Sequence, residues 1–181
     1  YDPEGAKKLL EEAGYADGFS LNMYITNETF RQKAATILQS YWKMIGVDLE
    51  INTVEWGTFS ETGASGKADV FAMGWSWYPD PYFFLDKMFA TSSIGTLGNG
   101  QGYSNAEVDQ LLEDALIETD QEKRTEMYHE ALKLITEDDP GIFYGNPSEC
   151  LGINPKVQDF HQRSDGTIKL FTPEENVWVV Q

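Results

Sequence analysis

The feature that most constrains the fold is the order in which strand-like and helix-like patterns follow one another. Residues 19–25 alternate apolar and polar side chains, which is typical of a half-buried strand. A helix is predicted to follow, capped by Asn27 and ended by Gly46. Further strands are predicted over 47–54 and 70–75, with a short helix between them. This order predicts an α/β fold, in which helices flank a central sheet.

Three more helices are predicted from their caps and apolar faces. The predicted caps are Asp2, Asn105 and Asp120, and the predicted terminators are Gly14 and Pro140. We expect the second and third of these helices to form a hairpin that covers one face of the sheet. A strand is predicted over 142–144, and strands and loops of less regular pattern follow it.

Charge and the scarcity of metal-binding side chains exclude several classes of protein. The formal charge is −17, from 30 acidic and 13 basic side chains, so nucleic acid is not an expected partner. Cys150 is the only cysteine, and His129 and His161 are too few for a zinc cluster, so no metal or cofactor is predicted. No apolar run approaches the roughly 20 residues of a membrane span. The ends, Tyr1 without an initiator methionine and the apolar string 177–180, favour a piece of a longer chain.

The segment most suited to ligand binding is 74–84, with sequence GWSWYPDPYFF. It follows a predicted buried strand, and ligands of open α/β sheets bind beyond the carboxyl ends of strands. Its two tryptophans, two tyrosines and two phenylalanines offer rings for stacking, and its prolines stiffen the backbone. The alternative is that these rings fill the core of the domain or pack against a neighbouring part of the protein.

Enzymatic motifs are incomplete. The GASGK segment around Ser65 imitates the end of a phosphate-binding loop, but Glu61 stands where a glycine is required and Ala68 follows the lysine. Asp69, Asp80 and Asp86 could pair for glycoside hydrolysis, yet nothing in the sequence sets their separation. We therefore predict that the protein is not an enzyme, and a carbohydrate-active hydrolase is the last alternative.

Five segments resemble the solute-binding proteins of ABC transporters, family 5, the dipeptide- and oligopeptide-binding type. They are YDPEGAKKLLEEAGYADGF at the start, LQSYWKMIGVDLEINTVEW, DVFAMGWSWYPDPYFFLDKMF, GYSNAEVDQLLEDA and EMYHEALKLITEDDPGIFY. They occur in the order found in the family and span nearly the whole chain. The chain is accordingly identified as a member of this family, from the C-terminal part of such a protein.

The resemblance implies a two-lobed protein of the periplasmic-binding-protein-like type II fold, with a central mixed sheet flanked by helices in each lobe. Residues 1–147 would form most of the second lobe, and 148–181 a tail crossing back towards the N-terminal lobe, which is missing here. The implied function is to capture a peptide or other small solute between the lobes and deliver it to the membrane permease of an ABC importer. The implied location is extracytoplasmic, either in the periplasm or on the cell surface as a lipoprotein.

One departure from the family bears on the ligand. In peptide-binding members an aspartate three residues after the motif tryptophan pairs with the terminal ammonium of the ligand, which is a charge-assisted contact. Here the segment is one residue short, and Trp77 lies at or beside that aspartate position. This exchange favours solutes without an obligatory free amine, so an oligosaccharide or other non-peptide solute is the main alternative to a peptide.

The predicted ligand-binding residues follow from the aromatic segment and its surroundings. Trp75, Ser76 and Trp77 are expected to contact the solute, with Tyr78 and Asp80 shaping or lining the pocket. Trp56 and Tyr103 are expected to border the cleft, although either could belong to the core.

Overall fold

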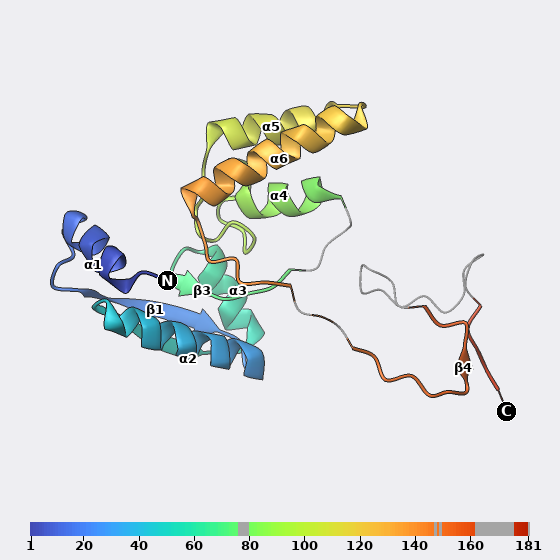
Figure 1. The fold of residues 1–181 in the computed structure, drawn as a ribbon, viewed down its shortest axis with the longest axis horizontal. Helices are drawn as coiled ribbons and strands as arrows, with labels where there is room; N and C mark the ends of the chain where they lie inside the picture. The colour runs from blue at the N-terminus through green and yellow to red at the C-terminus, as the bar shows by residue number, and fades with distance from the viewer. Residues whose placement is uncertain (76–79, 147, 149, 162–175, 181) are drawn as a thin grey trace.

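The computed structural model describes residues 1–75, 80–146, 148, 150–161 and 176–180 of the chain (Figure 1). The described elements are α1 (Pro3–Glu12), β1 (Phe19–Ile25), α2 (Thr29–Met44), β2 (Val47–Thr53), α3 (Trp56–Ala64), β3 (Val70–Phe71), α4 (Pro81–Phe89), the 3-10 turn η1 (Thr91–Ser93), α5 (Ala106–Ile117), α6 (Gln121–Asp138), β4 (Val157–Gln158) and β5 (Trp178–Val179). None of the described helices is long and apolar enough to cross a membrane.

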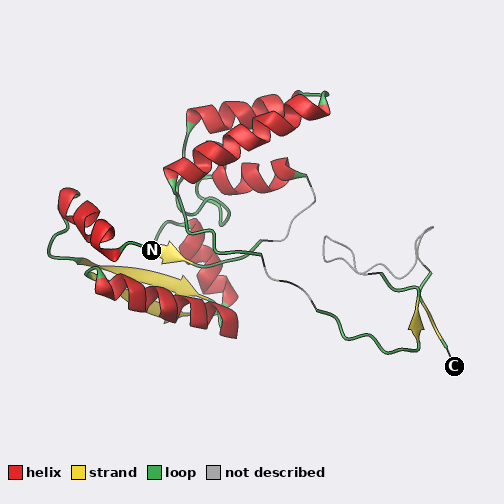
Figure 2. Cartoon of the chain, viewed as in Figure 1, coloured by secondary structure: helices red, strands yellow, loops and turns green. Residues whose placement is uncertain are grey.

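The sheet consists of three described strands in the order β2-β1-β3, all parallel (Figure 2). β1 pairs along its whole length with β2, from Phe19 opposite Val47 to Ile25 opposite Thr53. β3 pairs only with the last part of β1. Parallel neighbours require a crossover connection, which α2 provides between β1 and β2 and α3 provides before β3. The three strands therefore end at the same edge of the sheet.

The α/β class is confirmed, and the sheet that we predicted to be mixed is parallel in its described strands. Antiparallel pairing occurs in the separate ribbon of β4 and β5. The predicted strand over 70–75 ends at Phe71, which pairs with Tyr24 of β1. Residues 142–144, which we predicted to form a strand, have no regular secondary structure. Their three side chains are exposed.

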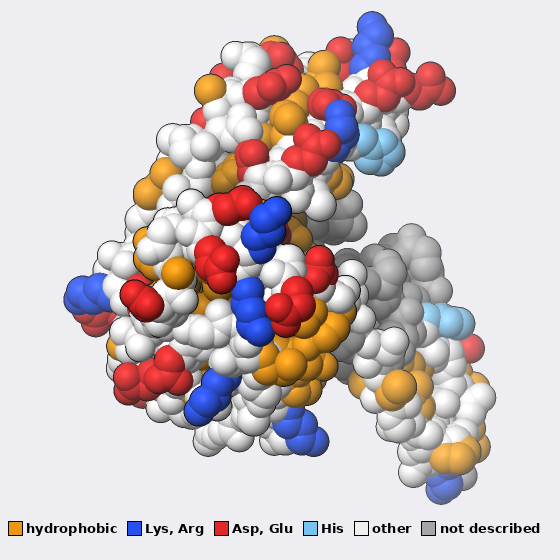
Figure 3. Space-filling view, turned by 60° about the vertical axis from the view of Figure 1, so that its left-hand side comes forward, with side chains coloured by type: hydrophobic (Ala, Val, Ile, Leu, Met, Phe, Trp, Pro, Cys, Tyr) orange, Lys and Arg blue, Asp and Glu red, His pale blue; other side chains and the backbone are white. Residues whose placement is uncertain are grey.

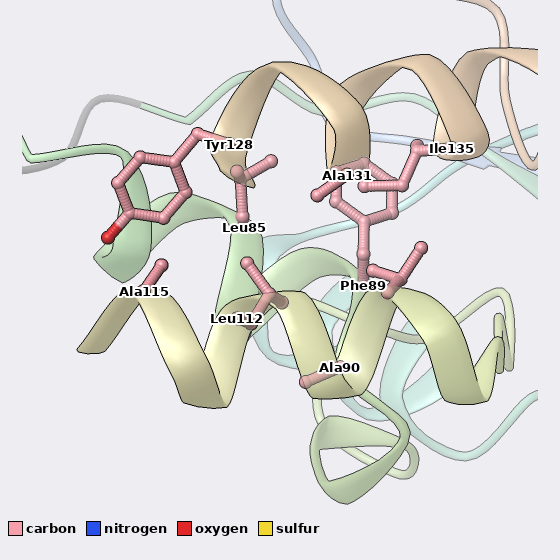
Figure 4. Packing of buried hydrophobic residues seen from close by; sticks show 9 residues of the cluster. Leu85, Phe89, Ala90, Leu112, Ala115, Tyr128, Ala131 and Ile135 are labelled. Carbon is pink, nitrogen blue, oxygen red and sulfur yellow. The ribbon is translucent and has the colours of Figure 1, made fainter. Parts of the chain in front are cut away.

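Two apolar clusters hold the described fold together. The first lies between α2 and the sheet, and contains Met23, Ile25, Ala35, Leu49 and Ala72. Alternation along β1 explains it, because Met23 and Ile25 project from the same face. The second is helical and joins α4, α5 and α6, with Leu85, Phe89, Leu112, Ala131 and Ile135 in its centre (Figure 4). The predicted hairpin of α5 and α6 thus forms, but it packs on α4 and not on the sheet.

The helix caps illustrate what local sequence can and cannot decide. Asp2, Asn105 and Asp120 cap their helices as predicted, each through a side-chain oxygen that accepts from backbone N–H groups. The prediction for Asn27 is wrong, because α2 begins at Thr29 with Glu28 in the cap position. The Asn27 Oδ1 instead accepts a hydrogen bond from Gln32 Nε2 at 2.7 Å.

Acidic side chains are spread over the surface in the view of Figure 3, and do not gather into one block. This distribution fits a solvated acidic surface and agrees with the even spacing of the acids along the sequence.

Candidate functional site

The carboxyl edge of the sheet is the place where the chemistry-bearing segments meet. β1, β2 and β3 end there at Ile25, Thr53 and Phe71, since all three run in the same direction. Open α/β sheets bind ligands in the crevice outside this edge. The segments that leave the edge are 26–31, 54–56 and 72–75, and they contain Trp56 and Trp75, two of the four candidate residues that the structure describes.

Trp56 stands at the carboxyl end of β2, in the first turn of α3. The preceding residue, Glu55, caps that helix by accepting from Gly57 N at 2.7 Å and Thr58 N at 2.6 Å. These hydrogen bonds hold the pKa of the Glu55 carboxyl below its ordinary value. The Trp56 ring stacks on the buried Phe59 ring, with 5.7 Å between centroids, yet 57% of the residue remains exposed. The geometry thus presents an anchored ring at the candidate edge.

Trp75 follows β3 by four residues and is half-buried. It lies within the predicted aromatic segment, of which Ser76, Trp77 and Tyr78 fall outside the described residues. The predicted contacts of these three residues with a solute therefore stay predictions. For Trp75, partial exposure beyond the end of a strand argues against complete enclosure within the core.

A polar network that sequence reasoning missed joins the end of β1 to the end of β3. The hydroxyl of Thr26, directly after β1, donates to Glu28 Oε2. Arg31 Nε lies 3.4 Å from the same carboxylate oxygen, and Arg31 Nη1 donates to the carbonyl of Ala72 at 2.9 Å. The pKa of Glu28 is lowered, mainly by the Thr26 hydrogen bond and further by attraction to Arg31, against a smaller effect of burial. The i,i+3 spacing of Glu28 and Arg31 was the available signal in the sequence.

The Asp80 carboxylate makes two sets of contacts that stabilise the fold. It caps α4, a helix that the sequence analysis did not predict, by accepting from Tyr82 N at 2.9 Å. Arg124 Nη2 lies 2.8 and 2.7 Å from its two carboxylate oxygens. Burial opposes ionisation of Asp80, but these hydrogen bonds outweigh it, so its pKa lies below the ordinary value. Asp80 therefore suits the shaping role that we predicted better than direct contact with solute.

Arg124 connects the three helices of the second cluster. Besides its contact with Asp80 at the start of α4, its Nε donates to the carbonyl of Ala115 in α5 at 3.0 Å. Its guanidinium carbon lies 4.9 Å from the centroid of the Tyr128 ring, a cation–π contact within α6. The Asp-Pro pair at 80–81 is a helix-start signal that could have revealed α4 from the sequence.

Tyr103 is held within the helical cluster. Its hydroxyl donates to Asp138 Oδ2 at 2.7 Å, and its ring meets Phe89 edge-on at 5.8 Å. Burial, together with the negative charge of Asp138, raises the pKa of Tyr103. Its backbone is fixed by the fully buried Asn99, whose Oδ1 accepts from Tyr103 N and whose Nδ2 donates to Tyr103 O, both at 2.9 Å. Its predicted place at the border of a cleft stays a prediction.

Exposed aromatic rings outside the predicted set link the helical cluster to helix α2. The ring of Phe143 contacts that of Phe89 in α4, with 6.1 Å between the ring centroids. The ring of the next residue, Tyr144, contacts that of Phe30 in α2, with 5.9 Å between the centroids. Phe30, Phe143 and Tyr144 are all more than half exposed. The segment after α6 thus runs from the helical cluster to the first turn of α2, beside the Glu28–Arg31 network.

Comparison with known proteins decides the family. The sequence profile described as bacterial extracellular solute-binding proteins, family 5 Middle, matches residues 1–96, which is more than half of the chain. The chain belongs to this family. The match covers α1 to η1, and so includes the whole three-stranded sheet with its carboxyl edge.

Named family 5 relatives extend the similarity beyond the profile. The chain is 30% identical over 172 residues to heme-binding protein A of Haemophilus influenzae, covering 92% of this chain and 31% of the relative. It is 32% identical over 166 residues to di/tripeptide-binding protein 1 of Pseudomonas aeruginosa, covering 88% of this chain and 31% of the relative. The chain therefore spans about a third of the length of these relatives.

The fold agrees with a solved structure. The periplasmic binding protein DppA of Helicobacter pylori, in complex with the peptide STSA, superposes with a TM-score of 0.69 at 33% identity. The match covers 75% of this chain and 27% of that protein. This similarity confirms a fragment of the type II fold of periplasmic binding proteins.

The contact between Asp80 and Arg124 should make the free energy of unfolding depend on pH. Asp80→Asn keeps a capping oxygen but removes the charge that Arg124 contacts. We expect unfolding free energy to fall by about 1–2 kcal/mol at pH 7, a modest value because solvent screens a partly exposed pair. Because the pKa of Asp80 is lower in the folded state, the contribution of its charge to stability is fully present above the pKa of about 3.9 that it has in the unfolded chain. The contribution is lost as the pH falls through the pKa of the folded state.

Urea unfolding of the two proteins between pH 7 and pH 3 measures this difference. The gap in stability should be constant down to about pH 5 and narrow below about pH 4. A gap that stays the same at pH 3 would contradict the assigned role of the Asp80 charge.

Proposed function

We propose that this chain is part of the solute-binding component of an ABC importer, and that it captures a peptide and delivers it to a membrane permease. The observation that carries the proposal is the convergence of three parallel strand ends on an edge bearing Trp56, Trp75 and the Glu28–Arg31 network. Membership in family 5 supports the class of function. The similarity to a di/tripeptide-binding protein and to a peptide-bound structure supports a peptide as the solute.

The same proposal places the chain in a larger protein. Residues 1–147 would form most of the second lobe, and 148–181 a tail that crosses towards a first lobe. The short coverage of the relatives supports this division, as does the position of the β4–β5 ribbon, which lies apart from the sheet and helices in Figure 1. The description of the family as bacterial and extracellular supports a place outside the cytoplasm.

The proposed activity is binding without chemical conversion. Among the described residues Asp69 accepts from the backbone N–H of Asn22 at 2.8 Å, and Asp80 contacts Arg124, so two of the carboxylates considered for hydrolysis have structural partners. The relatives compared above are named for binding. These observations support a binding protein over a hydrolase, and nothing in the described geometry favours an oligosaccharide over a peptide.

A thermal-shift screen of the complete two-lobed protein tests the proposal. Dialanine, trialanine and a tetrapeptide should raise the melting temperature, whereas maltotriose and cellotriose should not. At 100 times its dissociation constant a solute stabilises the folded state by about 2.7 kcal/mol, which a melting curve resolves. Stabilisation by the sugars alone would contradict the choice of a peptide, and turnover of a chromogenic glycoside would contradict the absence of chemistry.

The position of Trp77 makes a second prediction about peptides. Because Trp77 lies in the sequence at or beside the position of the ammonium-pairing aspartate, we expect the N-terminal amine to contribute little to affinity. Calorimetry should give N-acetyl-trialanine a dissociation constant within about threefold of that of trialanine, since no desolvated charge pair is lost. A loss of about a hundredfold on acetylation would mean that another carboxylate holds the amine.

The exposed ring of Trp56 predicts a third result. Trp56→Ala should weaken trialanine binding about tenfold, because aromatic anchors at a binding surface contribute disproportionately. Trp178→Ala is the matched control, since Trp178 is also half-exposed but belongs to the β4–β5 ribbon. Equal losses in the two variants would show that the carboxyl edge has no special part in binding.

A further inference from the structure

The Glu28–Arg31 network contacts the backbone at the end of β3. β3 is two residues long, and its pairing to β1 ends with a hydrogen bond of 3.4 Å from Ala72 N to Tyr24 O. The carbonyl of Ala72 accepts a hydrogen bond from Arg31 Nη1 at the shorter distance of 2.9 Å. Arg31 therefore binds the backbone at Ala72, where the hydrogen bonding between β3 and β1 ends.

Between Ala72 and Trp75 the chain passes through Gly74, which has no side chain. At Gly74, a Cβ would meet no heavy atom within 4 Å among the described residues other than its chain neighbours. Trp75 is the next residue. Gly74 therefore brings no side-chain packing of its own between Trp75 and the anchor at Ala72, which lies three residues before Trp75.

Arg31 is itself held in place by Glu28, the cap residue of α2, which in turn contacts Thr26 at the end of β1. Its Nε lies 3.4 Å from Glu28 Oε2, which also accepts from the hydroxyl of the buried Thr26. The Arg31 side chain is 19% exposed, whereas that of Glu28 is 56% exposed. Thr26, Glu28 and Arg31 thus form a cross-brace from the end of β1, through the first turn of α2, to the end of β3.

We propose that Arg31 is a positioning residue that fixes the backbone leading from β3 into Trp75, and so sets the orientation of that indole towards a bound peptide. Arg31 acts on the solute through this backbone and not by contact. Two donors at different places on the guanidinium are needed, Nε for Glu28 and Nη1 for Ala72, and a single ammonium does not reproduce that geometry. The role in binding rests on the proposed function, while the brace itself does not.

Three variants of the same protein test the proposal. Arg31→Gln removes the charge and the fork, Arg31→Lys keeps the charge, and Lys33→Gln is the matched control, because Lys33 is an exposed cation two positions further along α2. Hydrogen exchange of the fragment spanning 72–75, compared with fragments of β1 and β2, reports on the brace. Calorimetry with trialanine reports on binding.

We expect both Arg31 variants to speed exchange over 72–75 about tenfold, with β1 and β2 unchanged, because a local opening becomes easier. Both should weaken trialanine binding about tenfold, whereas Lys33→Gln should change neither quantity. Wild-type exchange and affinity in Arg31→Lys would overturn the proposal by showing that charge alone suffices. Weaker binding with unchanged exchange would overturn it in favour of direct contact with the solute.

Two further outcomes separate this inference from others. Faster exchange across the whole sheet in Arg31→Gln would overturn it, since the residue would then support the fold in general. If no peptide binds to the unaltered protein, the proposed function fails, and the exchange pattern over 72–75 still decides whether the brace exists.

Discussion

Parallel pairing of β1 with both of its neighbours is the constraint on which the candidate site depends. Because β2 and β3 run in the same direction as β1, their carboxyl ends reach the same edge, and the segments that follow them become neighbours there. The helices that connect the strands begin at this edge, so their first turns supply Arg31 and Trp56. Reversing one strand would send its following segment to the opposite edge and divide the site.

Two arginines then make contacts with oxygen atoms of residues far away in the sequence. These contacts fix the positions of segments that strand pairing alone only brings close together. Arg31 reaches the carbonyl of Ala72 across 41 residues, and Arg124 reaches Asp80 across 44 residues. The first contact is made at Ala72, after β3, and the second at Asp80, where α4 begins. Arginines are planar side chains with several donors, which suit such multiple contacts better than lysines.

Much of the local structure could be predicted from the sequence, and the errors have physical causes. Asp2, Asn105 and Asp120 cap helices as expected, because capping needs only a side-chain oxygen and the next few N–H groups. The strand predicted over 142–144 does not form, because an apolar run becomes a strand only where a neighbouring strand offers hydrogen bonds. Helix α4 was missed because its many rings looked like a binding surface, although Asp80 and Pro81 are a helix-start signal.

The sequence by itself determined the α/β order of elements, the caps of α1, α5 and α6, the family and the position of Trp56 and Trp75 after strands. These are properties of short windows, in which periodicity and capping act over a few residues. Only the tertiary structure decided that Asp80 faces Arg124, that Arg31 meets Ala72, and that the α5–α6 hairpin packs on α4. Those contacts join residues far apart in the chain, and which of several possible acceptors an arginine meets depends on how the intervening elements pack.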